Sequence, residues 1–192
     1  MYGFYLSPYN KDNTSEVIVG GYDSKMVKSG DIHWSNSILE DVWTVNLTYV
    51  KIGGNDANPS KYGIISGLPY LGIPIGAAYF AFESAVLKSQ MCQSNLNEYG
   101  AFVCVADLEI TKLPNITMKI NDDIEINITA EYYVYNRTVN KEDIYFLGIK
   151  PLEEDVAFVL GSPFMNRVYT ILDFDKKKIG LASIFEMENA VP

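Results

Sequence analysis

Few residues of this 192-residue chain could carry out chemistry on their own. It has one histidine, His33 in the stretch DIHWSN, and two cysteines, Cys92 and Cys104. No serine or cysteine is spaced to use His33 as a general base, so we interpret His33 as a strand-surface residue. The cysteines have no further soft ligand nearby, which argues against a metal site and leaves either a disulfide or two buried thiols. No phosphate-binding glycine pattern occurs, so we expect no cofactor.

Five Asn-x-Ser/Thr tripeptides, the acceptor signal for N-glycosylation, begin at Asn13, Asn46, Asn115, Asn127 and Asn136. The 15 asparagines and 21 serines and threonines would produce about 1.6 such tripeptides by chance, so five is an excess. This excess favours a secretory, vacuolar or extracellular location, and an oxidising compartment in turn favours a Cys92–Cys104 disulfide. An organellar or cytosolic assembly stays open as the other location.

The formal net charge of -9 argues against nucleic acid and anionic membrane surfaces as partners. No apolar run approaches the roughly 20 residues that a transmembrane helix needs. The first ten residues, MYGFYLSPYN, lack the basic start and apolar core of a signal peptide, so we expect none there.

The elements that must position these residues are mostly strands, because short apolar and aromatic runs recur between turn signals. In DVWTVNLTYVKIGG, polar Thr44 and Asn46 alternate with apolar Val45 and Leu47, as in a strand with two unlike faces. Hairpins are predicted to turn at 121–123 and at 175–178. No linker or repeat divides the chain, so we predict one mainly β domain over residues 1–192.

Only two segments look helical. The first spans 75–90, IGAAYFAFESAVLKSQ, which is rich in alanine and free of proline. The second is a short turn in SPFMNRVY, where Ser162 is expected to cap the N-terminus and Pro163 to take the first helical position.

Taken in order, these segments resemble the C-terminal lobe of pepsin-like aspartic proteases, peptidase family A1. VIVGGYDSKMVKSGDIHW is similar to the family's Gly-Gly-x-Asp segment and the strand after it, and LPNITMKIND to its Leu-Pro-x-Ile segment. The strongest match is AFVLGSPFMNRVYTILDFDKKKIGLA, whose strand pair is marked by Tyr169, Thr170, Asp173 and Gly180. The resemblance implies a single cathepsin D-like lobe of twisted antiparallel sheets, in which the active-site loop and the strand ending at 160–161 form a ψ-shaped crossing.

The resemblance places the active-site loop at Tyr62–Pro74, YGIISGLPYLGIP. Aspartic proteases use two carboxylates about 3 Å apart, one from each lobe, which share a proton and activate a water. An ungapped match aligns Ile65 with the family's catalytic aspartate, and Gly67 with its glycine. Leu68 then replaces the serine or threonine whose hydroxyl hydrogen-bonds the carboxylate. Ile65 has no titratable proton, so the site is predicted to be degenerate. Losing both acid and hydroxyl avoids a buried unpaired polar atom, and we interpret the loop as an apolar core.

Two further implications concern partners. The family's lobe disulfide usually joins the position of Cys104 to a cysteine near IYFLG; this chain has none there, so Cys104 is expected to pair with Cys92. The family needs two lobes, whereas this chain resembles one. In the family, the hydroxyl at the position of Ser66 contacts the opposite lobe. Ser66 keeps this hydroxyl, so Ser66 and Gly67 are predicted to lie at a lobe interface.

Two functions follow from these implications. The first is a catalytically inactive homologue that serves as a binding or structural component of an assembly. A second lobe, another protein subunit or a second copy would then cover the former active-site face. The alternative is the C-terminal lobe or a fragment of an aspartic endopeptidase whose other lobe carries the chemistry.

Overall fold

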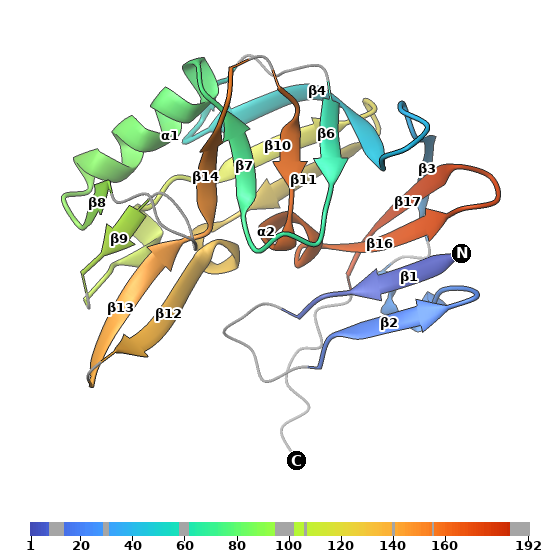
Figure 1. Ribbon diagram of the computed structural model, residues 1–192, viewed down its shortest axis with the longest axis horizontal. Coiled ribbons are helices and arrows are strands. Elements are labelled where there is room, and N and C mark those ends of the chain that lie inside the picture. Colours follow the sequence, from blue (N-terminus) through green and yellow to red (C-terminus); the bar gives the residue numbers. More distant parts are fainter. Residues whose placement is uncertain are drawn as a thin grey trace.

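The computed structural model describes residues 1–7, 14–28, 31–57, 62–94, 102–105, 107–139, 141–154 and 156–184 (Figure 1). Strands predominate in these ranges, arranged in three sheets with two α-helices. The predicted fold class, mainly β with antiparallel sheets and two short helices, is therefore confirmed. Within the same ranges, no helix is both long enough and apolar enough to cross a membrane.

The first sheet joins the beginning of the chain to its last described hairpin. Its order is β2-β1-β16-β17-β3, with every neighbouring pair antiparallel. The bounds are β1 (Tyr2–Tyr5), β2 (Glu16–Val19), β3 (His33–Asn36), β16 (Val168–Asp173) and β17 (Lys178–Ser183). The predicted hairpin near 175–178 is confirmed, because β16 and β17 are joined by a turn at 174–177.

The second sheet has the order β11-β10-β4-β6-β15-β7-β14, with β5 paired to β4. Its bounds are β4 (Thr44–Ile52), β5 (Asn55–Asp56), β6 (Tyr62–Ile65), β7 (Leu71–Pro74), β10 (Ile116–Ile120), β11 (Ile124–Ile128), β14 (Ile149–Leu152) and β15 (Phe158–Leu160). The first part of β4 pairs with β6 and the rest with β10, so β4 connects a layer of β10 and β11 to a layer of β6, β15, β7 and β14.

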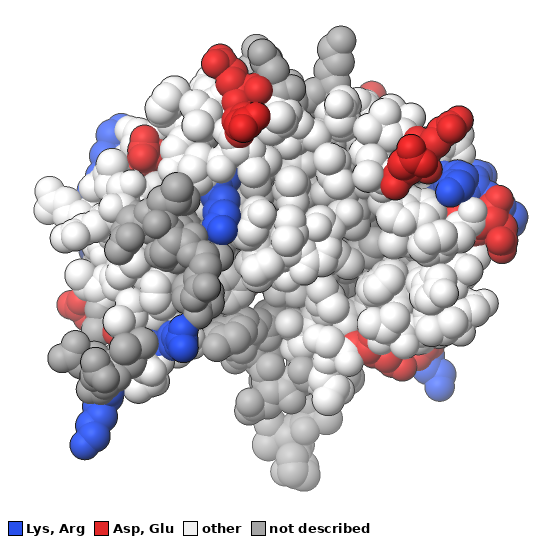
Figure 2. All heavy atoms as spheres, in the orientation of Figure 1, with Lys and Arg blue, Asp and Glu red and all other residues white. Residues whose placement is uncertain are grey.

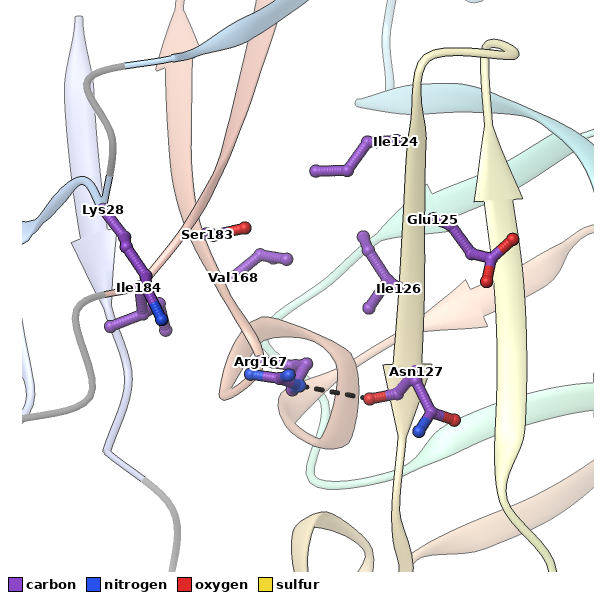
Figure 3. A pocket seen from close by; sticks show the side chains of 9 residues that line it. All are labelled: Lys28, Ile124, Glu125, Ile126, Asn127, Arg167, Val168, Ser183 and Ile184. Atoms are coloured by element: carbon purple, nitrogen blue, oxygen red, sulfur yellow. Dashed lines mark hydrogen bonds between the residues drawn. The ribbon is translucent and has the colours of Figure 1, made fainter.

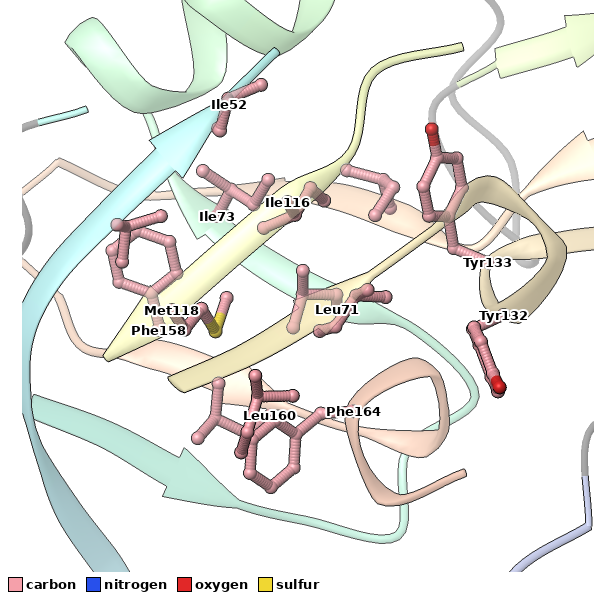
Figure 4. Close-up of a cluster of buried hydrophobic side chains, with 14 of the residues drawn as sticks. Ile52, Leu71, Ile73, Ile116, Met118, Tyr132, Tyr133, Phe158, Leu160 and Phe164 are labelled. Carbon is pink, nitrogen blue, oxygen red and sulfur yellow. The ribbon is translucent and has the colours of Figure 1, made fainter. Parts of the chain in front are cut away.

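The two layers enclose the main core (Figure 4). Ile116 and Met118 of β10 lie in it with Leu71 of β7 and Leu160 of β15, and none of these four side chains is exposed. The alternation predicted for β4 holds at Val45, Asn46 and Leu47, which are buried, exposed and buried in turn. It is wrong for Thr44, which is fully buried because its hydroxyl accepts from the amides of Ile38 and Leu39. The hairpin predicted at 121–123 joins β10 to β11, and Asn121 and Asp122 there have the positive φ values of 50° and 61° that tight hairpin turns require.

The third sheet has the order β12-β13-β9-β8, and its bounds are β8 (Cys92–Ser94), β9 (Phe102–Cys104), β12 (Val134–Val139) and β13 (Glu142–Leu147). Helix α1 (Ala77–Lys88) lies within the predicted range of 75–90, and Gln90 after it takes the left-handed conformation that ends many helices. Short 3-10 turns occur at 24–26, 110–112 and 130–132.

Helix α2 (Ser162–Met165) corrects one expectation. Ser162 was expected to cap it, but the N-cap residue is Gly161 and no side chain caps the helix. The Ser162 hydroxyl instead donates to the carbonyl oxygen of Leu68, 3.2 Å away and 94 residues earlier in the chain. A long-range contact has therefore replaced the local one that the sequence suggested.

Candidate functional site

The loop between β6 and β7 is held by backbone hydrogen bonds from two elements distant in sequence. The amide of Ile65 donates to the carbonyl oxygen of Trp43 at 2.8 Å, which ties the end of β6 to the residue before β4. The amide of Ser66 donates to the carbonyl oxygen of Leu160 at 3.1 Å, at the end of β15. Strand β15 is parallel to β6 and antiparallel to β7, so it lies between the two arms of the loop. This is the predicted ψ-shaped crossing.

The tip of the loop is fixed to the start of α2. The carbonyl oxygen of Leu68 accepts from the amide of Ser162 at 2.8 Å as well as from its hydroxyl. Gly161 makes this approach feasible, because a Cβ there would collide with the backbone oxygens of Leu68 and Tyr70. The loop geometry is therefore set by backbone contacts and does not require a carboxylate.

The side chains of the loop divide between core and surface. Ile65, at the position predicted for the catalytic acid, is only 8% exposed and belongs to the main hydrophobic core. Leu68 is 40% exposed, so the interpretation of the whole loop as an adapted apolar core is wrong for this residue. The Leu68 carbonyl is the group that is anchored, which leaves the side chain directed away from the core.

Ser66 is half-buried and its hydroxyl oxygen accepts from the amide of Leu68 at 3.3 Å. No described residue receives the Ser66 proton, and Gly67 beside it is exposed with no atom within 4 Å of a Cβ built there. The lobe-interface role of Ser66 and Gly67 stays a prediction.

Chemically, the described part of the loop offers backbone groups, one hydroxyl and hydrocarbon side chains. No cluster of three or more histidine, cysteine or acidic side chains that would suit a metal ion occurs among the described residues. His33 lies exposed on the edge strand β3, opposite Leu181. Asp173 is buried, and its carboxylate accepts from the amides of Asp175 and Lys176, so it shapes the turn before β17.

The cysteines are joined as predicted: Cys92 and Cys104 form a disulfide between β8 and β9, at directly opposed positions. On its other side β9 pairs with β13, and Tyr145 there lies opposite Cys104. Strand β13 contains the stretch IYFL, near which the family resemblance would have placed the second cysteine. The disulfide has therefore moved to the other neighbour of the same strand.

Four of the five glycosylation candidates lie in described residues, and all four are exposed: Asn46, Asn115, Asn127 and Asn136. The fifth, Asn13, lies outside the described residues.

Asn127 also borders a hollow of about 420 Å³ between β11 and the first sheet, where Arg167 donates to its carbonyl oxygen at 3.1 Å (Figure 3). The charged side chains that line the hollow are Lys28, Arg167 and Glu125.

A chain of aromatic rings beside the loop was not foreseen from the sequence. The ring of Trp43 lies 4.9 Å from that of Phe174, and the ring of Phe174 lies 5.2 Å from that of Tyr2. Val17 and Val19 pair with Phe4 and Tyr2 across β1 and β2, and so extend this apolar surface. We call Tyr2, Val17, Val19, Trp43 and Phe174 the aromatic edge. Its members come from four separate segments, so no local pattern could have revealed it.

Comparisons with known proteins agree with this geometry. A family model described as eukaryotic aspartyl protease matches residues 1–184. The aspartic proteinase sxa1 of Schizosaccharomyces pombe is 26% identical over 196 residues, which cover 95% of this chain and 35% of sxa1. Gastricsin of Callithrix jacchus is 26% identical and human gastricsin 25%, each over 95% of this chain and 46% of its own length. The chain thus spans half or less of these relatives.

Proposed function

Because the chain belongs to the eukaryotic aspartyl protease family, we propose that residues 1–192 correspond to the C-terminal lobe and that this lobe is not catalytic. It serves as a binding or structural component of an assembly, and a second lobe covers the face that carries the Ser66–Gly67 loop. The observation that carries this proposal is the buried Ile65 side chain at the end of β6.

The chemistry of the family depends on a carboxylate at this point. A carboxylate can take a proton from water and share it with its partner across the cleft, whereas a hydrocarbon side chain can do neither. Burying Ile65 also stabilises the fold by about 1.5–3 kcal/mol relative to exposing it. Ile65 therefore stabilises the fold of the lobe, and the lobe contributes no carboxylate to a catalytic pair.

The partner is proposed to bind at the aromatic edge and the loop. Val19 on β2 is 72% exposed and Phe174, in the turn after β16, is 46% exposed, so two large apolar side chains of the aromatic edge are open to solvent. Strand β2 has no further neighbour among the described strands, and the one charged residue on it is Glu16 at its start. In Figure 2 most charged side chains lie near the outline of the view, and the described surface over β6 and β7 is largely uncharged.

We assign this surface to a separate lobe rather than to a second copy of the chain. The relatives are about twice as long or longer, so in them further chain accompanies the matched part. The Ser66 hydroxyl, whose proton no described residue accepts, is proposed to donate across this interface.

Hydrolysis assays test the loss of catalysis. The native assembly should not cleave an unfolded protein substrate at acid pH in a manner that a statine-type transition-state mimic inhibits. Ile65→Asp provides the acid, and Ile65→Asn is its matched control of similar size without a titratable proton. Cleavage by the native assembly that the mimic blocks, and that Ile65→Asp but not Ile65→Asn increases, would overturn the proposal.

Light scattering tests the partner. The purified chain alone is expected to associate as its concentration rises, because its apolar surface is uncovered. A chain that stays strictly monomeric and stable at all concentrations contradicts the need for a partner, and a stoichiometric homodimer would replace the separate lobe with a second copy.

The half-length match also supports the second candidate function, an endopeptidase lobe or fragment whose other lobe carries the chemistry. Such a heterodimer would hold one aspartate in place of two, so we expect it to be a strongly impaired enzyme. The hydrolysis assay distinguishes the two functions. A secretory or vacuolar location is part of the first proposal, supported by the disulfide.

A further inference from the structure

Three glycosylation tripeptides lie in or next to strands, placed so that the middle residue faces the core and the asparagine faces outward. They are Asn46-Leu47-Thr48 in β4, Asn115-Ile116-Thr117 at the start of β10, and Asn127-Ile128-Thr129 at the end of β11. Their middle residues, Leu47, Ile116 and Ile128, are core residues no more than 3% exposed. Since side chains alternate along a strand, each asparagine is directed to the opposite, outer face, and all three asparagines are exposed.

The strand pairing brings these tripeptides together on one layer. Strand β10 lies between β4 and β11, and Thr117 is directly opposite Asn127. The Thr117 hydroxyl donates to Oδ1 of Asn127 at 3.2 Å. This contact uses the amide oxygen and leaves Nδ2, the atom that bears an N-linked glycan, without a hydrogen bond to any described residue. The contact is therefore compatible with a sugar on Asn127.

There is also open space beside these side chains. Asn115, Thr117 and Asn127 line a shallow hollow of about 540 Å³, together with Gly53, Gly54 and Pro114. The two glycines provide no side chain that would block it. A first sugar on either asparagine can thus extend over the sheet without displacing a packed group.

We infer that Asn46, Asn115 and Asn127 carry N-linked glycans, and that the outer face of β4, β10 and β11 is a sugar-coated face turned to solvent. The donor is a lipid-linked oligosaccharide diphosphate of the secretory pathway. Nδ2 of each asparagine forms a bond to the anomeric carbon, the bond from that carbon to the phosphate oxygen breaks, Nδ2 loses one proton, and the lipid diphosphate leaves.

This coating has a consequence for the assembly. Figure 1 shows β10 and β11 behind β6, β7 and β14, and the core between the layers separates their outer faces. A partner that binds at the Ser66–Gly67 loop leaves the glycans exposed. This second part rests on the proposed function, whereas the modification itself does not.

Glycopeptide mapping tests the modification. The chain is secreted from eukaryotic cells, deglycosylated with peptide-N-glycosidase in heavy-oxygen water, and mapped by mass spectrometry. Label at two or three of the three asparagines supports the inference, and label at one or none overturns it. Asn127→Gln and Thr129→Ala should each remove the same glycan, because the asparagine and the hydroxyl are both required. Asn55→Gln, an exposed change outside any tripeptide, is the control and should leave the mass pattern unchanged.

Digestion of the undenatured native assembly tests the orientation. Glycans on this face should be removed without release of the partner, as native mass spectrometry would show. Resistance until the assembly is denatured would mean that the face is covered and would overturn the orientation. Failure of the mapping would leave the hydrolysis result intact, so the two proposals fail separately.

Discussion

At the scale of single residues, burial at the end of β6 decides which side chain position 65 can hold. The end of β6 points its last side chain into the core, where Ile65 is almost fully buried. A carboxylate at this point would need a positively charged partner or strong hydrogen-bond donors to offset its desolvation. The main core to which Ile65 belongs consists of hydrophobic side chains, which favour an isoleucine.

Ile65→Asp is expected to reduce the free energy of unfolding at pH 7 by about 3 kcal/mol. Burial should raise the pKa of the new carboxyl above its unfolded value of about 3.9. Below about pH 4 the new carboxyl is protonated in both states, so its charge does not lower the free energy of unfolding. As the pH rises from there to the raised pKa of the folded state, the unfolded chain ionises first and the free energy of unfolding falls. Urea denaturation at several pH values measures it. Ile65→Asn has no such pH dependence, and identical pH profiles for the two variants would refute the explanation.

Tyr133 provides a second test at this scale. Burial raises the pKa of its hydroxyl above the ordinary value, and the hydroxyl donates to the carbonyl oxygen of Pro114 at 2.7 Å. Above about pH 10 the unfolded chain loses this proton and the folded chain retains it, so stability falls by up to about 1.4 kcal/mol per pH unit. Tyr133→Phe should be about 1 kcal/mol less stable at pH 7 and should lose less stability from pH 10 to 11. Parallel alkaline unfolding curves would contradict this prediction.

At the scale of elements, the loop between β6 and β7 depends on an approach between three segments. Strand β15 must lie between β6 and β7, and the chain must then turn into α2 directly beneath the loop tip. Gly161 is the position that permits this, since its neighbours there are backbone atoms that cannot rotate away.

Gly161→Ala is expected to be severely destabilising, by more than about 3 kcal/mol, because its new methyl group meets the backbone oxygens of Leu68 and Tyr70. Gly67→Ala is the matched control within the same loop, because no atom lies within 4 Å of a Cβ there. Its effect should stay within about 0.5 kcal/mol. Thermal unfolding followed by circular dichroism compares them, and a mild effect of Gly161→Ala would show that the crossing can widen.

At the scale of the whole molecule, the surface is uneven in character. Exposed asparagines of the glycosylation tripeptides lie on the outer side of β4, β10 and β11, and apolar side chains are exposed along the aromatic edge. On the edge strand β2, Glu16 is charged but Val17 and Val19 are exposed, so an isolated chain offers this part of the edge for pairing. A single lysine there should protect it, because extension of the sheet would bury the charge.

Val19→Lys is expected to lower the concentration-dependent association of the isolated chain while changing the free energy of unfolding by no more than about 0.5 kcal/mol. Asn55→Lys adds the same charge at an exposed position of β5 and should leave association unchanged. Light scattering over a concentration series measures both. Equal association of Val19→Lys and wild type would mean that isolated chains do not associate through β2.

The sequence by itself determined what depends on neighbours along the chain. The hairpin at Asn121–Asp122, the alternation of β4, the range of α1 and the ordered motifs of one family all follow from local spacing and turn chemistry. The disulfide followed from the family pattern and the absence of another cysteine. Tertiary structure decided which side chains of the loop are buried, so Ile65 and Leu68 differ although both are aliphatic. It also gave Ser162 a distant carbonyl in place of a cap, and it assembled the aromatic edge from separate segments. The physical reason is that burial and long-range hydrogen bonds depend on which elements meet, and no periodicity within one element records that.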